Sequence, residues 1–155
     1  MQLSQDLLKL KNPTEAIDHV EDFLRDYARK AGVQGVVVGM SGGLDSSVVA
    51  ALCGKAFDDH RKVLGLCMPE EETRNQQNII DAENVAQNFN VELKAVDITP
   101  IVRAFAGNLA AFDPRNKLAN GNLKARVRAV ILYYYSNILN RLVVGTTDKS
   151  EMMLG

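Results

Sequence analysis

The chain has 155 residues, enough for one domain with a substantial hydrophobic core. Its 46% hydrophobic and 24% charged residues are typical of a globular protein in water. A formal net charge of −1 argues against a partner that needs a strongly basic surface, so we expect neither nucleic acid nor a membrane as a partner. The two cysteines lie in apolar runs, which predicts buried thiols rather than a disulfide or a metal site. No secretory leader or membrane-spanning run is visible, so the sequence predicts a cytoplasmic protein.

The first predicted element is a helix that begins after Asn12 and ends at Gly32. Asn12 is a favourable N-cap, Pro13 suits the first helical position, and Glu15 stands where a capping box places an acid. Apolar residues recur with helical spacing between these ends. Glycine is the residue that most often ends a helix, which fixes the expected stop.

Strands and helices are predicted to alternate along the rest of the chain. The expected strands lie near residues 35–40, 63–68, 91–96 and 142–145. Helices are expected near residues 45–56, over 100–112 and over 122–140. A further helix is expected to begin at a capping box of Thr73 and Gln76 and to extend to Phe89. Residues 114–121 are expected to form a polar loop. This alternation predicts an α/β fold, a three-layer α/β/α Rossmann-like arrangement around a doubly wound parallel sheet.

The long connection over residues 97–141 predicts how the sheet is ordered. It is long enough to carry the chain across the sheet, so that the fourth strand pairs with the free side of the first. The expected spatial order is 3-2-1-4, and ligands of such sheets bind beyond the strand ends at the switch point. The turns after the first and fourth strands should then face each other. The last residues, 149–155, have the pattern of a helix beginning after a strand, so we expect residues 1–155 to be a single domain that is incomplete at its C-terminus.

The most informative segment is the Gly-rich turn Gly39–Ser47, between an apolar strand and a helix. Such a turn directs backbone N–H groups and a helix N-terminus toward one point, which favours phosphate. The turn also contains a carboxylate, Asp45, which anion binding alone does not require. An acid within a phosphate site predicts bound Mg²⁺ and phosphate chemistry.

Known turn motifs fit this segment unequally. A Walker A loop needs a lysine that the turn lacks, and the dinucleotide fingerprint needs a glycine where Ser41 stands. The nucleophile elbow Gly-x-Ser-x-Gly fits residues 39–43 and leaves a serine hydrolase as a remote alternative. Such an enzyme places its histidine late in the chain, whereas His19 and His60 come too early.

The run Ser41-Gly42-Gly43-Leu44-Asp45-Ser46 resembles the pyrophosphate loop of the ATP pyrophosphatases, enzymes of the adenine nucleotide alpha hydrolase-like fold that cleave ATP between its α and β phosphates. The resemblance implies that ATP is bound by Gly39, Met40, Ser41, Gly42, Gly43, Leu44, Asp45 and Ser46. By itself the loop does not choose among the enzymes of this group. A GMP synthetase-like enzyme, a tRNA-thiolation enzyme and a nucleotide-binding module without turnover remain open on the loop alone.

Two later segments narrow the choice. Both resemble the ammonia-dependent NAD synthetase family. The first is the run Gly121-Asn122-Leu123-Lys124-Ala125-Arg126-Val127-Arg128 with Tyr133, and the second is the run Gly145-Thr146-Thr147-Asp148-Lys149-Ser150-Glu151. The resemblance covers about residues 35–155. It implies a ligase that forms a C–N bond by amidating deamido-NAD with ammonia. The resemblance also implies that ATP is the co-substrate and Mg²⁺ the cofactor. It further implies that NAD, AMP and pyrophosphate are the products and that the enzyme is a homodimer.

The same resemblance assigns roles to residues. Arg126 corresponds to a position that contacts deamido-NAD, and Thr146 corresponds to a position that contacts ATP. Arg126 and Asp45 are predicted to be the catalytic residues. Glu151 corresponds to a Mg²⁺ ligand that acts together with Asp45. For Glu151 an ordinary helix-terminal acid is the alternative.

Helical spacing places Asn122, Arg126 and Tyr133 on one face. From spacing alone a solvated face is the alternative, and the resemblance implies that these residues bind deamido-NAD. Lys124 and Arg128 are predicted to point elsewhere, as surface or interface charges. The acidic run at residues 70–72 is predicted to be a solvated loop.

Overall fold

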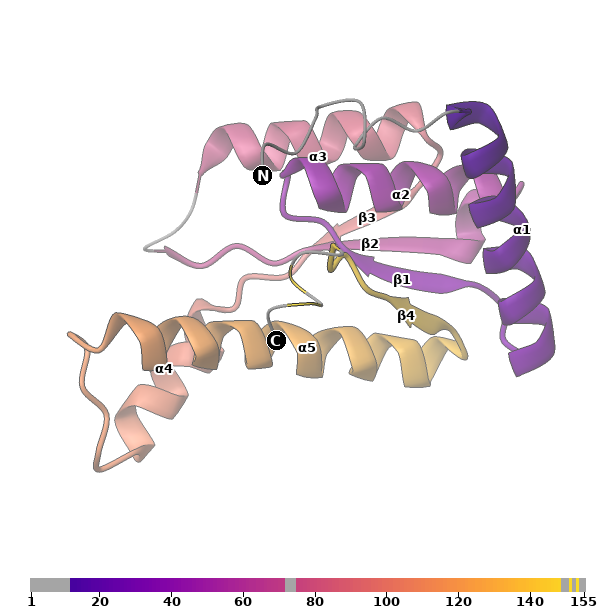
Figure 1. Cartoon of the computed structure of the whole chain (residues 1–155). Coiled ribbons are helices and arrows are strands. Elements are labelled where there is room, and N and C mark those ends of the chain that lie inside the picture. The colour runs from indigo at the N-terminus through magenta and orange to yellow at the C-terminus, as the bar shows by residue number, and fades with distance from the viewer. Residues whose placement is uncertain (1–11, 72–74, 149–150, 152, 154–155) are drawn as a thin grey trace.

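The computed structural model of the chain describes residues 12–71, 75–148, 151 and 153. In chain order its elements are α1 (Pro13–Ala31), β1 (Val36–Gly39), α2 (Leu44–Ala56), the 3-10 helix η2 (His60–Lys62), β2 (Val63–Cys67), α3 (Gln76–Asn88), β3 (Glu92–Ala95), α4 (Thr99–Asn108), α5 (Lys117–Leu139) and β4 (Leu142–Val144). The helices lie on both sides of the central sheet (Figure 1). This confirms the predicted three-layer α/β/α arrangement.

The four strands of the described residues form one parallel sheet in the order β3-β2-β1-β4. Val36 in β1 stands opposite Val63 of β2 on one side and Leu142 of β4 on the other. The predicted order 3-2-1-4 is therefore confirmed. Because β1 and β4 are neighbours, the segments that follow them leave the sheet at the same edge.

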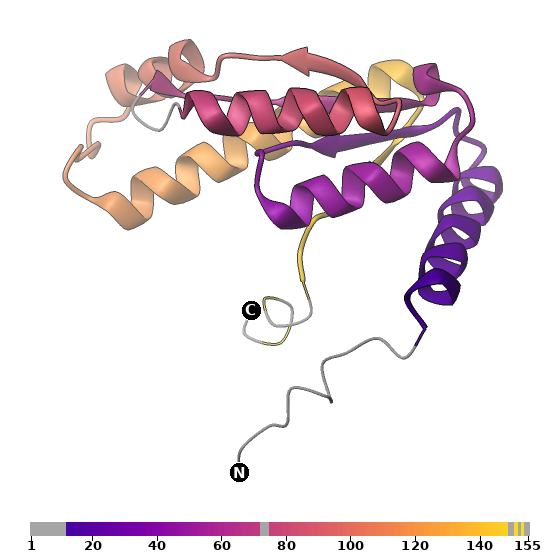
Figure 2. The same ribbon diagram turned by 90° about the horizontal axis from the view of Figure 1, so that it is seen from above.

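The core consists of two apolar layers, one on each face of the sheet. Alternate side chains of β1 supply both, because successive residues of a strand point to opposite faces. Val36 and Val38 pack into the layer beneath α1, α2 and α3, and Val37 packs into the layer beneath α4 and α5. Seen from above, α2 and α3 lie side by side across the sheet (Figure 2).

The ends of α1 are as predicted. The Asn12 side chain accepts a hydrogen bond from the Glu15 N–H at 3.3 Å, and Pro13 occupies the first turn. Gly32 adopts the left-handed conformation at φ 66°, and its N–H donates to the carbonyls of Ala28 and Arg29. Local cap chemistry was therefore sufficient to place this helix.

Two later helices begin at residues other than those predicted. Helix α3 is capped by Asn75, whose side chain accepts from the Gln77 N–H at 2.9 Å; the expected cap, Thr73, lies outside the described residues. Helix α5 begins at Lys117 rather than at 122, because the Asn116 side chain accepts from the Ala119 N–H at 3.0 Å. The expected loop at 114–121 therefore already contains the first turn of α5. Helix α4 ends at Asn108, before the predicted residue 112.

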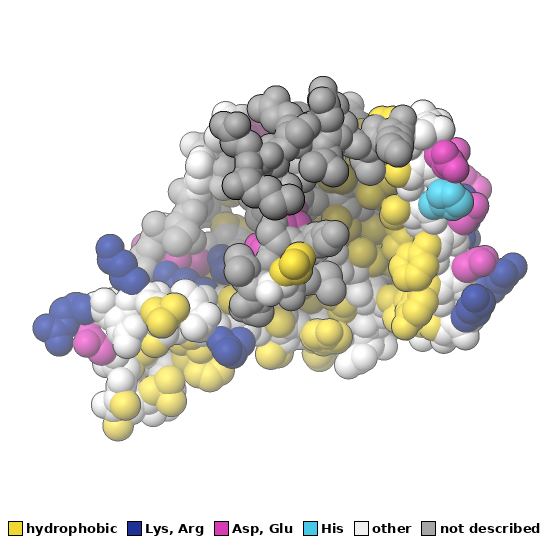
Figure 3. All heavy atoms as spheres, viewed as in Figure 1, with side chains coloured by type: hydrophobic (Ala, Val, Ile, Leu, Met, Phe, Trp, Pro, Cys, Tyr) yellow, Lys and Arg dark blue, Asp and Glu magenta, His cyan; other side chains and the backbone are white. Residues whose placement is uncertain are grey.

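Among the described residues no helix combines the length and the apolar character that a membrane span requires. Exposed apolar side chains nevertheless gather over α1 on the face that Figure 3 shows. The exposed apolar residues of this helix are Val20, Phe23 and Tyr27. A second exposed apolar set lies on α5 and consists of Leu118, Val130, Tyr133, Tyr134 and Ile138.

Candidate nucleotide-binding site

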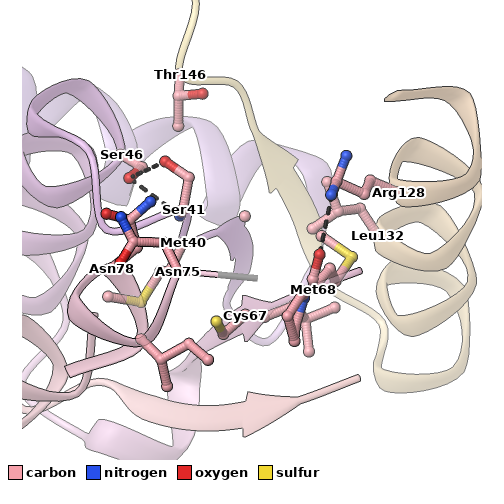
Figure 4. A pocket seen from close by; sticks show the side chains of 14 residues that line it. Met40, Ser41, Ser46, Cys67, Met68, Asn75, Asn78, Arg128, Leu132 and Thr146 are labelled. Atoms are coloured by element: carbon pink, nitrogen blue, oxygen red, sulfur yellow. Dashed lines mark hydrogen bonds between the residues drawn. The ribbon is translucent and has the colours of Figure 1, made fainter. Parts of the chain in front are cut away.

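A pocket of about 400 Å³ opens beyond the carboxyl ends of β1 and β2, between α3 and α5. It is lined by Gly39, Met40, Ser41, Ser46, Leu66, Cys67, Met68, Pro69, Asn75, Asn78, Ile79, Arg128, Leu132 and Thr146. In Figure 4, Ser41 and Ser46 stand on one side, Arg128 and Leu132 on the other. Both predicted loops contribute to this pocket, since Ser41 follows β1 and Thr146 follows β4.

The Gly-rich turn is held by hydroxyl groups of its own residues. The buried Ser46 hydroxyl accepts from the Ser41 N–H at 3.2 Å and donates to the Gly43 carbonyl at 3.0 Å. The Ser41 and Ser46 hydroxyls share a hydrogen bond of 3.0 Å, and the Ser41 hydroxyl also accepts from the Gly43 N–H at 3.2 Å. These bonds fix the turn at the pocket wall before any ligand arrives.

Only glycine fits at position 42. Its φ is +79°, and a Cβ there would lie 2.1 Å from the backbone oxygen of Asn78 in α3. The turn therefore packs against α3 through bare backbone. The same contact brings Asn78 into the pocket wall.

The N-terminus of α2 follows the turn directly. Gly43 is its N-cap, and no side chain caps it. The first backbone N–H groups of a helix have no partner within the helix, and the helix dipole makes this end attractive to anions. A phosphate group would suit this arrangement.

Asp45 lies in the first turn of α2 and is exposed. No hydrogen bond or ion pair joins its carboxylate to another described residue. Leu44 beside it is 78% exposed. The Asp45 carboxylate is thus unengaged among the described residues, and it does not line the pocket.

Thr146 and Glu151 lie on the segment that follows β4. Thr146 lines the pocket. The Glu151 carboxylate accepts from the Asp148 N–H at 3.1 Å, while the Asp148 side chain accepts from the Glu151 N–H at 2.8 Å. This reciprocal pair is a capping box, so one Glu151 oxygen already has a structural partner.

The residues predicted to bind deamido-NAD lie outside this pocket. Asn122, Arg126 and Tyr133 are all exposed, on one face of α5. Arg126 donates to the Asn122 carbonyl at 3.1 Å, and Tyr133 is 60% exposed. The structure therefore places these three together, as their spacing predicted, but does not bring them to the Gly-rich turn.

On the opposite face of α5 the structure contradicts three predictions, those for Lys124, Arg128 and the acidic loop at Glu70. Lys124 is an almost buried partner of Glu70, with 2.9 Å between Nζ and Oε2 and side-chain exposures of 13% and 5%. Arg128 lines the pocket, and its Nε donates to the Met68 carbonyl at 3.1 Å. These two are therefore not surface charges, and the loop that holds Glu70 is not simply solvated. Leu132 continues the same face, and residues four apart on a helix share a face, so the spacing contained a signal for this set.

The serine-hydrolase alternative finds no support in the geometry. The Ser41 hydroxyl is paired with Ser46 rather than with a base. Neither histidine lines the pocket. His60 precedes β2 and so lies at the end of the parallel sheet opposite the turn, while His19 is exposed on α1.

Comparison with known proteins identifies the family. A family model described as NAD synthase matches residues 16–155. The chain belongs to the NAD synthase family. The NH(3)-dependent NAD(+) synthetase of Methanocaldococcus jannaschii is 46% identical over 142 residues, which are 91% of this chain and 54% of that protein.

Solved structures of NAD synthetases show the same fold. The NH3-dependent NAD synthetase of Campylobacter jejuni, solved with a nitrate ion, aligns with a TM-score of 0.85 at 35% identity, covering 94% of this chain and 61% of that one. A glutamine-dependent NAD+ synthetase of Acinetobacter baumannii, solved with adenosine diphosphate, aligns with a TM-score of 0.86 at 30% identity, covering 100% of this chain and 29% of that one. The chain spans about half the length of the curated relatives it matches.

Proposed function

We propose that this chain forms the ATP-binding part of an ammonia-dependent NAD synthetase. The observation that carries the proposal is the pocket at the switch point, which the Gly-rich turn and Thr146 line together. The relatives named NH(3)-dependent NAD(+) synthetase support the substrates, and the glutamine-dependent relative solved with adenosine diphosphate supports an adenine nucleotide. Residues 1–155 are proposed as a single domain. Its cytoplasmic location stays a prediction from the sequence.

The proposed reaction has two steps. A carboxylate oxygen of the nicotinate group of deamido-NAD attacks the α-phosphorus of ATP, and the bond from that phosphorus to the pyrophosphate oxygen breaks. Ammonia then attacks the acyl carbon of the adenylylated intermediate, and AMP leaves as the amide forms. The ammonia nitrogen loses one proton, to solvent or to a base, as the amide NH2 group forms. Positioning and electrostatic stabilisation are the main contributions that such a site makes.

The turn and α2 are proposed to bind the pyrophosphate portion. The backbone N–H groups at the start of α2 and the Ser41 and Ser46 hydroxyls supply donors, and Gly42 and Gly43 permit close approach of the backbone. Thr146 contributes a hydroxyl from the opposite loop. Gly39 and Met40 complete the wall beside β1.

The donor set is compatible with Mg²⁺, which needs only one or two carboxylates when substrate phosphates complete its shell. Within the described residues no group of three or more His, Cys, Asp or Glu side chains forms a ready metal cage. Asp45 is free to serve as a ligand, and Glu151 retains one oxygen without a described partner. We propose these two as the Mg²⁺ ligands. When bound, the ion would neutralise charge on the departing pyrophosphate.

Deamido-NAD is proposed to contact Asn122, Arg126 and Tyr133. Because these residues face away from the nucleotide pocket, the second substrate would have to approach α5 from its outer side. The same side carries exposed Val130, four residues after Arg126, which supports the proposal that α5 contributes to a homodimer interface.

The test supplies ATP, Mg²⁺, deamido-NAD and either ammonium or glutamine, and measures NAD and AMP together. We expect both products with ammonium. Calorimetric titration with ATP provides an independent reading of the binding step. Binding without AMP release would reduce the function to nucleotide binding, and no binding would overturn the proposal.

Asp45→Asn is expected to abolish the Mg²⁺-dependent part of ATP affinity while leaving the fold intact, because it removes the free carboxylate. Asp18→Asn is the matched control, since Asp18 is also an exposed helical aspartate but lies on α1. Equal Mg²⁺ dependence in both variants would refute the metal role of Asp45.

A further inference from the structure

One charged side chain stands out in the nucleotide pocket. Among the described residues that line it, Arg128 is the sole charged one; the others are apolar, hydroxyl or amide side chains and glycine. A pocket built for a polyanion needs positive charge, and the N-terminus of α2 supplies only about half an elementary charge. Arg128 supplies a full one, and arginine keeps its proton in proteins.

The arginine is anchored so that part of its guanidinium stays available. Its Nε donates to the Met68 carbonyl at the end of β2, at 3.1 Å. No described residue accepts a hydrogen bond from its two Nη groups. Figure 4 shows the side chain across the pocket from the Ser41–Ser46 pair. The anchor limits the motion of the side chain, so little of its freedom remains to be lost when a ligand binds.

We propose that Arg128 binds the α-phosphate of the nucleotide, opposite the turn that binds the pyrophosphate portion. This inference rests on the proposed function and extends it. A triphosphate whose β and γ groups lie at the turn and α2 leaves its α-phosphate for the far side of the pocket. The paired Nη groups of arginine match the oxygens of a phosphate. Arg128 would then also stabilise the charge on the phosphorus that the carboxylate attacks.

The proposal separates Arg128 from Arg126, two positions earlier. At 3.6 residues per turn the two side chains point about 200° apart. Arg126 is exposed and bonds back to the Asn122 carbonyl, whereas Arg128 is half-buried and lines the pocket. The two arginines would thus serve different ligands from opposite sides of α5.

The experiment measures the affinity of the chain for adenosine, AMP and ADP by calorimetry, in the native chain and in Arg128→Met. Methionine keeps an unbranched stem but removes the charge. We expect the native chain to bind AMP more tightly than adenosine, and Arg128→Met to lose about tenfold or more in AMP affinity. Adenosine affinity should stay unchanged because it has no phosphate. Lys117→Met is the matched control, an exposed cation removed from the first turn of the same helix.

Two results would overturn the inference while leaving the proposed function standing. Unchanged AMP affinity in Arg128→Met would mean that the arginine does not contact the phosphate. Equal losses for adenosine and AMP would mean that it only supports the pocket wall through Met68. If Arg128→Met fails to fold, Arg128→Lys replaces it, with the same comparison of ligands. Failure of the native chain to bind any adenine nucleotide would overturn the proposed function itself.

Discussion

Replacing Gly42 by alanine should separate the Gly-rich turn from α3. At φ +79° an alanine is strained by about 1–3 kcal/mol. Its Cβ would also stand 2.1 Å from the Asn78 oxygen and 2.7 Å from the Asn78 Cα, whereas ordinary contacts begin near 3.4 Å. The turn and α3 must therefore move apart by about 1 Å, a displacement that costs on the order of 100-fold where reacting groups are positioned. We expect a loss of at least 2 kcal/mol in the free energy of unfolding, roughly the strain together with the displaced contact.

Two glycines provide matched controls for this variant. Gly32→Ala carries comparable strain at φ +66° but has no atom within 4 Å of the new Cβ, so it reports backbone strain alone. Gly145→Ala has neither strain nor a close contact. Urea unfolding and calorimetric titration with ATP are measured on all three. If Gly42→Ala is no less stable than Gly32→Ala and binds ATP like the native chain, the close approach of turn and helix is wrong.

The other predictions concern buried groups. Glu70→Gln or Lys124→Met should each lower the free energy of unfolding, by up to about 3–5 kcal/mol, because each removes one charge from a nearly buried ion pair. Urea unfolding of the single and double variants should show a double loss well below the sum, and additive losses would contradict the coupling of this pair. Burial raises the pKa of the Cys53 thiol to about 12. From about pH 9 to about pH 12 the unfolded chain therefore loses the Cys53 proton while the folded chain keeps it, and stability should fall by about 1.4 kcal/mol per pH unit from this group. Cys53→Ala should show a shallower decline in pH-dependent urea unfolding, and equal slopes would refute the shift.

The sequence was sufficient for the features that depend on local chemistry. The Asn12 and Gly32 caps, the Gly-rich turn and the strand order followed from residue types and spacing, because each depends on backbone preferences or connection length. The start of α5 did not follow, since Asn120 and Gly121 are weak helix formers that its packing and the Asn116 cap override.

The sequence also did not predict how α5 is oriented about its own axis. Apolar residues occur around much of this helix, so hydrophobic spacing did not reveal which face meets the sheet. The sequence predicted Arg126 as a ligand contact and Arg128 as a surface or interface charge. Only packing against the segment that follows β2, through the Met68 carbonyl and Glu70, showed that the Lys124–Arg128 face points inward.

The parallel pairing of β1 has a consequence for folding during synthesis. Val36 meets Val63 after one short helical crossover, but it meets Leu142 only after the 78 residues between Val63 and Leu142 have also emerged. Contacts between distant positions form slowly because the intervening chain must first be closed into a loop. The Gly-rich turn is therefore expected to be ordered early, among α1, α2 and β2, before Thr146 reaches the pocket. Nucleotide binding would then report the docking of β4, since Thr146 reaches the pocket wall only after β4 has docked.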